Sequence, residues 1–207
     1  ITTRLVGSEM CIRDRVYAGL FGKDLITDSK DDNPGTSNAF IYGGMACGIL
    51  TLLGDLIKGV LPVLLYLRMT RGNIDAYFAP VLAAPVLGHI FPVFYRFKGG
   101  KGIAVSFGCL LGMLPVSQPL LTLAVIYVVL SVGICVSPHY YRTIVTYALF
   151  AAVTALYNSR FNVSVGITLG CLLISVLIIY RHLKSREAKQ KFTVSFAPLQ
   201  FLSLIHI

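Results

Sequence analysis

The chain has 207 residues, of which 56% are hydrophobic and 13% are charged, and its formal net charge is +9. Soluble domains are about one-quarter charged, so this composition argues against a water-soluble enzyme and favours a membrane protein. It also argues against a nucleic-acid-binding module, because the Lys and Arg residues lie between apolar runs and form no basic helix.

Both ends of the chain differ from the rest. Codons for residues 10–15 can be chosen so that their reverse complement encodes residues 202–207, Leu-Ser-Leu-Ile-His-Ile. An inverted repeat of this kind resembles a sequencing adapter translated with its insert, and such segments are set aside before a fold is interpreted. The sequence therefore predicts foreign segments at 1–15 and 202–207 around one membrane domain at 16–201.

Apolar runs alternate with short polar segments along this domain. A stub of a truncated first helix at 16–22 and a polar loop at 23–38 come first, and the apolar runs then span 39–67, 77–97, 103–117, 119–136, 143–157 and 163–180. The run at 103–117 is short for a span and contains Pro115, so we expect a tilted or broken helix there. Together with the stub, the runs predict an all-α polytopic membrane protein of seven helices with the first truncated. The cysteines have no CxxC spacing and are expected to pack between helices.

The positive charges are distributed unevenly over the loops. If successive helices alternate in direction, one set of loops carries most of the Lys and Arg residues, whereas the other carries only Arg68, Arg71 and Arg160. Positively charged loops face the cytoplasm. The polar segments 23–38, 96–102 and 181–191, which belong to the positive set, are therefore predicted to converge on the cytoplasmic side.

The segment with the strongest chemical signal is rich in glycine and basic. Gly99, Gly100 and Gly102 allow the backbone to approach a ligand and to turn its N–H groups towards an anion. A helix is predicted to begin directly afterwards, so that the positive end of its dipole faces the same point. Lys101 and Lys98 add positive charge. The combination suits a phosphate, with a flexible basic loop as the alternative.

Ionisable residues within or beside the apolar runs are further candidates. His89 lies in the run before the glycine segment, where a packed structural histidine is the alternative to a functional one. Asp55 and Lys58 stand at i and i+3 on one helix face, where they either neutralise each other or leave Lys58 facing the anionic site. His182 opens the basic tail, for which a solvated tail that contacts anionic lipid is the alternative to catalysis.

The polar loop before the run at 39–67 is dense in hydrogen-bonding groups. Asn33, Thr36, Ser37 and Asn38 stand close together there, although helix capping needs only Ser37 or Asn38. This density favours recognition of a polyol or a phosphate.

Three stretches resemble the bacterial acyl-phosphate:glycerol-3-phosphate acyltransferase family, PlsY. They are Asn33-Pro-Gly-Thr-Ser-Asn-Ala-Phe40, the stretch from Gly48 to Pro62, and Gly88-His…Pro92 followed by Lys98-Gly-Gly-Lys-Gly102. The resemblance covers 16–187. It implies a seven-helix inner-membrane enzyme that moves a fatty acyl group from acyl phosphate to glycerol 3-phosphate, giving lysophosphatidic acid and phosphate for phospholipid synthesis without coenzyme A. We further expect no metal or other cofactor, an active site facing the cytoplasm, and a monomer that contacts membrane lipid and no nucleic acid.

The residues and the resemblance together define a candidate site. Binding of the substrates and their phosphates is predicted for Asn33, Gly35, Ser37, Asn38, Lys58, Lys98, Gly99, Gly100 and Gly102. The catalytic candidates are His89, Lys101, His182 and Asp31. Lys101 would neutralise the leaving phosphate, and the proton would pass to His89, His182, Asp31 or the phosphate itself.

The chain departs from the family pattern at several positions. Asp31 replaces a Ser, Ile41 stands where an Arg is common, Ser185 takes an Asn position, and the final Arg and Gly-x-Glu are not recognisable. These departures keep a divergent, inactive lipid-binding homologue as one alternative. A small-anion transporter is another, because helix ends and an intramembrane Asp–Lys pair also suit carriers, although the sequence has no inverted repeat.

Overall fold

The computed structural model describes residues 36–93, 97, 99–116, 118–134, 136–161, 164–184 and 193–194. Its helices are α2 (Thr36–Gly43), α3 (Met45–Met69), α4 (Phe78–Ile90), α5 (Ile103–Leu111), α6 (Gln118–Val128), the π-helical turn η3 (Val129–Gly133), α7 (His139–Phe161) and α8 (Val165–Leu183). Two short strands, β1 (Val136–Ser137) and β2 (Thr193–Val194), pair antiparallel. The described part of the chain is thus almost wholly α-helical, as predicted.

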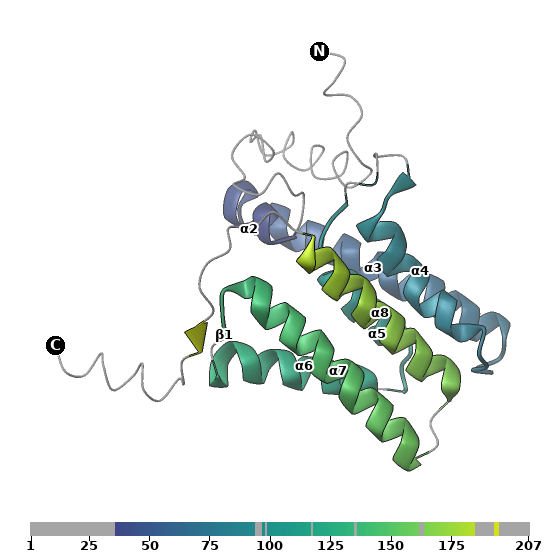
Figure 1. Ribbon diagram of the computed structural model, residues 1–207. Coiled ribbons are helices and arrows are strands. Elements are labelled where there is room, and N and C mark those ends of the chain that lie inside the picture. The colour runs from purple at the N-terminus through teal and green to yellow at the C-terminus, as the bar shows by residue number, and fades with distance from the viewer. Residues whose placement is uncertain are drawn as a thin grey trace.

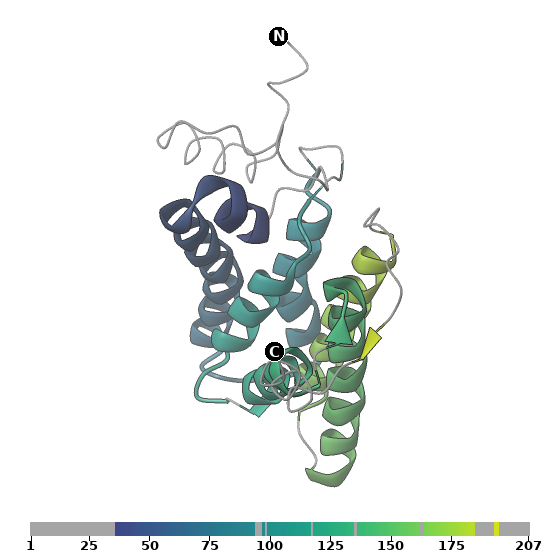
Figure 2. The ribbon, with the colours of Figure 1, turned by 90° about the vertical axis from the view of Figure 1, so that its left-hand side faces the viewer.

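The apolar run at 39–67 forms two helices instead of one. Gly44 separates α2 from α3 with φ 85° and ψ 177°, a conformation that glycine adopts at little cost. α2 lies beside the first turns of α3 (Figures 1 and 2), and Phe40 packs on Gly48, where an added Cβ would lie 2.3 Å from the ring. Because α2 begins at Thr36, the polar loop predicted at 23–38 ends earlier than expected.

The next helices are shorter than the apolar runs that contain them. α4 ends at Ile90, although the run continues to 97, because Pro92 disfavours helical geometry in the residue before it. α5 has only 9 residues and is followed by a turn at 112–115 that includes Pro115, so the break predicted in that run is confirmed. α6 continues into η3 and runs across the other helices: Figure 2 shows it nearly end-on.

Two of the described helices, α3 and α8, are long and apolar enough to cross a membrane. α4 and the stretch formed by α6 and η3 are apolar but shorter. Large apolar side chains on α3, such as Leu53, Ile57 and Leu61, are exposed. A surface of this kind is expected where the surrounding solvent is lipid.

α3 and α5 pack at close range because glycines on each helix face main-chain atoms of the other. A Cβ on Gly59 would lie 2.4 Å from the carbonyl oxygen of Val105, and a Cβ on Gly108 would lie 2.3 Å from that of Leu56. Small residues at a membrane helix interface allow the two backbones to approach each other. This contact holds α5, and with it the segment just before α5, against α3.

Replacing Gly108 with alanine is expected to destabilise the fold by about 1–3 kcal/mol, the usual cost of overpacking. The added methyl group would meet main-chain atoms of Leu56, which cannot rotate away as a side chain can. Thermal unfolding of the protein in detergent measures the effect. Gly133→Ala is the matched control, because the nearest atom to its Cβ would be a Val129 methyl carbon at 4.0 Å. Equal melting temperatures for the two variants would contradict the close α3–α5 packing.

The buried core lies among α4, α5, α7 and α8. Leu82 and Ile174 are fully buried there, and so is Tyr147, whose hydroxyl bonds that of Ser106 across the α5–α7 contact at 2.5 Å. Since Ser106 donates to the Ile103 carbonyl at 2.7 Å, Tyr147 is the donor in this pair. The packing role predicted for the cysteines is confirmed for three of them, which are buried free thiols: Cys47, Cys109 and Cys171.

α4 and α8 lie side by side and run in the same direction (Figure 1). Gly166 lies against Asp75 at the start of both helices, where an added Cβ would lie 1.9 Å from the Asp75 carbonyl oxygen, and Gly170 lies against Leu82 one turn later. At this end Ser164 also donates to the Ile74 carbonyl at 2.9 Å. The C-terminal end of α8 therefore reaches the segment that follows α4.

Candidate functional site

The segment that follows α4 folds back against the end of that helix through residues 99–102, here called the glycine loop. A Cβ on Gly99 would lie 2.0 Å from the carbonyl oxygen of His89 and 2.6 Å from Cδ of Pro92. The Gly100 N–H donates to the same His89 oxygen at 3.2 Å. Only a residue without a side chain fits at position 99, and the loop is held there by main-chain contact.

α5 begins directly after the glycine loop, as predicted. Gly102 caps the helix in the left-handed conformation with φ 82°, which favours glycine, and its carbonyl accepts from the Ser106 N–H at 2.9 Å. Lys101 stands half-buried before it. The first N–H groups of α5 and the positive end of its dipole thus start at the loop, an arrangement that can hold an anion.

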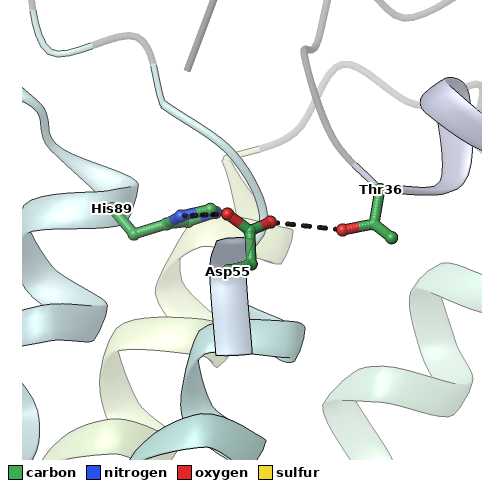
Figure 3. A network of polar contacts seen from close by, with 3 residues as sticks. All are labelled: Thr36, Asp55 and His89. Carbon is green, nitrogen blue, oxygen red and sulfur yellow. Dashed lines mark hydrogen bonds and ion pairs between the residues drawn. The ribbon is translucent and has the colours of Figure 1, made fainter. Parts of the chain in front are cut away.

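A buried carboxylate links three helices beside the glycine loop. Asp55 of α3 accepts a hydrogen bond from the Thr36 hydroxyl at 3.2 Å, and its other oxygen lies 3.8 Å from Nδ1 of His89 (Figure 3). The side chains of Asp55 and His89 are 2% and 5% exposed. A buried carboxylate needs polar partners to offset its loss of hydration. Asp55 therefore ties the start of α2 and the end of α4 to α3.

Asp55→Ala is expected to lower the free energy of unfolding by roughly 1–3 kcal/mol, because buried polar groups lose their acceptor. Thr36→Val removes one hydrogen bond and keeps the carboxylate, so its effect should be nearer about 1 kcal/mol. Denaturant unfolding of both variants in detergent measures the difference. If Thr36→Val cost as much as Asp55→Ala, the contact with His89 would contribute nothing.

The last turn of α8 closes the glycine loop from another side. Arg181 donates from Nη2 to the Gly99 carbonyl at 2.8 Å and from Nε to the Gly100 carbonyl at 3.2 Å. The adjacent His182 is 2% exposed, and its Nδ1 donates to the Ile178 carbonyl at 2.9 Å. The solvated-tail interpretation of His182 is therefore wrong, because the helix continues past this residue and buries its ring.

The structure brings together part of the predicted site. Six of the predicted residues lie at one end of the bundle: His89, Gly99, Gly100, Lys101, Gly102 and His182. Lys58 is half-buried one turn beyond Asp55 on α3, and Ser37 and Asn38 stand in the first turn of α2. Outside the described residues lie Asp31, Asn33, Gly35 and Lys98.

Residues from three distant polar segments meet at this end, as the charge distribution predicts. Thr36 comes from the segment at 23–38, the glycine loop from 96–102, and Arg181 from 181–191. Thr36 and Arg181 are not among the predicted site residues, although Thr36 belongs to the cluster of hydrogen-bonding groups in the polar loop. The one available signal for Arg181 is its place beside His182 in the positively charged segment 181–191, and nothing local indicates that its side chain reaches the loop.

Known proteins are similar to the chain over most of its length. The family model described as glycerol-3-phosphate acyltransferase matches residues 14–188. A glycerol-3-phosphate acyltransferase of Neisseria meningitidis serogroup C / serotype 2a is 36% identical over 183 residues, which cover 84% of this chain and 88% of that protein. A glycerol-3-phosphate acyltransferase of Shewanella loihica is 37% identical over 165 residues, covering 76% of this chain and 75% of that protein.

A solved structure shares the helical architecture. It is the crystal structure of PlsY (YgiH), an integral membrane glycerol 3-phosphate acyltransferase, in its glycerol 3-phosphate form. The TM-score is 0.65 at 26% sequence identity, with 84% of this chain and 82% of that chain covered. The all-α bundle is therefore that of an integral membrane protein, and the chain belongs to the glycerol-3-phosphate acyltransferase family of enzymes.

Proposed function

We propose that the chain transfers a fatty acyl group from acyl phosphate to glycerol 3-phosphate, releasing lysophosphatidic acid and inorganic phosphate. The observation that carries the proposal is the glycine loop at the start of α5, held between the His89 carbonyl oxygen and Arg181. Both substrates carry a phosphate, and a glycine loop that leads into a helix N-terminus is suited to bind one. Membership of the family supports glycerol 3-phosphate as the acceptor.

In this proposal the glycine loop and Lys101 hold the phosphate of the acyl donor. Acyl phosphate is already activated, so the protein needs mainly to position the reactants and to stabilise charge on the leaving group. The Lys101 ammonium and the first N–H groups of α5 would neutralise the phosphate as its charge grows. Lys98, which precedes the loop in the sequence, and Lys58 on α3 would add to the positive potential.

The acceptor glycerol 3-phosphate is assigned to the predicted binding residues of the segment 33–38. These are Asn33 and Gly35, which lie outside the described residues, and Ser37 and Asn38 in the first turn of α2. The Thr36 hydroxyl donates to Asp55, whose carboxylate also faces His89, so the first turn of α2 is tied to the α4 residue beside the loop. This linkage supports a position for the acceptor between α2 and the glycine loop.

One bond forms and one breaks at the acyl carbon. A hydroxyl oxygen of glycerol 3-phosphate bonds to that carbon, and the phosphate leaves with the electron pair of the carbon–oxygen bond. We assign the hydroxyl proton to His89 or to the departing phosphate. His89 is preferred to His182 because it contacts the glycine loop through its own carbonyl, whereas Nδ1 of His182 donates to its own helix. Asp31 stays a further candidate acceptor.

The site is assigned to the cytoplasmic face of the bacterial plasma membrane. Described cations at the site end include Lys101, Arg142, Arg181 and Lys184, whereas the opposite end has Arg68, Arg71 and Arg160. The larger number of positive charges at the site end agrees with the positive-inside rule, by which positively charged loops face the cytoplasm. The exposed apolar face of α3 supports contact with lipid, and we propose that the chain acts as a monomer.

The proposal is tested by mixing the purified chain in detergent with acyl phosphate and glycerol 3-phosphate and measuring released phosphate and lysophosphatidic acid. Stoichiometric formation of both products is expected, with none when acyl-coenzyme A replaces acyl phosphate. Phosphate release that does not depend on glycerol 3-phosphate would contradict the assigned acceptor.

A second candidate function, that of an inactive lipid-binding homologue, has one observation in its favour. Ile41, at a position where an Arg is common in the family, is 70% exposed on α2 and carries no charge. Binding of lysophosphatidic acid by a chain that forms neither product would favour this candidate and would overturn the proposed acyl transfer.

A further inference from the structure

Arg181 makes an unusual pair of contacts for a side chain in a phosphate site. Its guanidinium donates to two consecutive main-chain carbonyls, those of Gly99 and Gly100, and the donor–acceptor distances are 2.8 and 3.2 Å. These are acceptors of the protein itself, so two of the five guanidinium N–H donors are directed at the glycine loop. A residue that served only to attract an anion would not need this geometry.

The contacts fix how two peptide planes are turned. In a planar trans peptide the carbonyl and the following N–H point in opposite directions. The Gly99–Gly100 peptide shows this arrangement. The Gly99 carbonyl accepts a hydrogen bond from Arg181, whereas the Gly100 N–H donates to the His89 carbonyl on the other side at 3.2 Å. By the same rule, the contact with the Gly100 carbonyl turns the N–H of Lys101 away from Arg181.

A glycine loop needs such a constraint more than other loops do. Glycine has the widest choice of backbone conformations and loses the most conformational freedom when it is ordered. Donors that are already oriented bind and stabilise an anion better than donors that the ligand must first order. The contact with His89 holds the first of the two planes by its N–H, and the contact of Arg181 with the Gly100 carbonyl constrains the second.

We infer that Arg181 is a positioning residue, which orients the Gly99–Gly100 and Gly100–Lys101 peptides so that the glycine loop is preformed for a phosphate. The inference rests on the proposed function for its effect on turnover, but the orientation itself is a property of the free protein. In this inference α8 also contributes to the reaction, because the last turn of this helix sets the conformation of the loop that precedes α5.

Arg181→Lys is the decisive variant, because lysine keeps the charge but has no planar fork to reach two carbonyls at once. If Arg181 acts through orientation, Arg181→Lys and Arg181→Gln should both lose at least about tenfold in kcat/KM, as expected for lost hydrogen bonds from a charged group. Inhibition by inorganic phosphate should weaken in parallel. Lys184→Gln is the matched control: it removes an exposed charge from the same helix end and should stay within about twofold.

Hydrogen–deuterium exchange gives a readout that does not depend on activity. In Arg181→Lys, amides of residues 99–102 should exchange faster than in the unsubstituted chain, whereas those in the middle of α4 and α8 should not change. Unchanged loop exchange, or full activity of Arg181→Lys, would overturn the inference. If Arg181→Gln does not fold, Arg181→Lys alone decides. An unsubstituted chain that releases no phosphate refutes the proposed function, and loop exchange then still decides the role of Arg181.

Discussion

Replacing Lys101 with alanine is expected to lower kcat/KM for acyl transfer by about 100- to 1,000-fold, the usual effect of removing one group that stabilises developing charge. Lys101 is the cation within the glycine loop, and it precedes Gly102, the residue that caps α5. Its ammonium would oppose the charge that collects on the phosphate as the acyl bond breaks. Because this charge is greatest in the transition state, the loss should fall mainly on kcat.

Steady-state measurement of phosphate release, with each substrate varied in turn, checks this prediction. Arg68→Ala is a suitable comparison, since it removes an exposed positive charge from the opposite end of the bundle. It should leave kcat and KM near their original values. Lys101→Arg should recover part of the activity, because it restores charge with a different shape. Turnover by Lys101→Ala at the rate of the unsubstituted chain would remove Lys101 from the mechanism.

Gly99→Ala is expected to reduce activity by roughly 100-fold, the cost associated with misplacing a binding group by about 1 Å. The new Cβ would lie 2.0 Å from the His89 carbonyl oxygen and 2.7 Å from that of Ile90. Neither main-chain atom can yield as a side chain does, so the glycine loop must move. That movement would break the Gly100–His89 hydrogen bond and the contact between Arg181 and the Gly99 carbonyl.

The comparison for Gly99→Ala is Gly88→Ala, one residue before His89. An added Cβ at Gly88 meets nothing within 4 Å, and alanine is favoured over glycine inside a helix, so its effect should be far smaller. Activity and melting temperature should be measured together, because displacement of the loop lowers the first more than the second. Equal activities of the two variants would show that the close approach of Gly99 to α4 has no functional consequence.

The elements that sequence patterns predict correctly are those that depend on local composition. The apolar runs locate each described helix, Pro115 marks the break after α5, and the glycines before Ile103 mark its N-terminus. Local composition predicts whether a segment is surrounded by lipid or by water, and single glycine and proline residues predict where the backbone can turn. It does not reveal the split at Gly44, because both helices there are apolar and one positive φ separates them.

The linkage of Asp55 shows where local patterns stop being informative. Its spacing from Lys58 predicts a pair on one helix face, but it does not indicate that the folded chain also places Thr36 and His89 at its carboxylate. Which partner a buried carboxylate meets depends on the angles at which α2 and α4 end against α3. Those angles follow from packing, such as that of Phe40 on Gly48, and from the conformation of Gly44.

Local sequence patterns are enough to predict a helical membrane protein, polar segments that converge at one end, and a glycine loop with Lys101 that begins a helix there. Such properties arise from residues close together in the chain and from the energy of placing charges in lipid. The hydrogen bonds from Arg181 to the carbonyls of Gly99 and Gly100, more than 80 positions away, can be recognised only in the folded chain. The reason is that this contact exists only when α4 and α8 pack in parallel and in one register, which glycines at 166 and 170 permit.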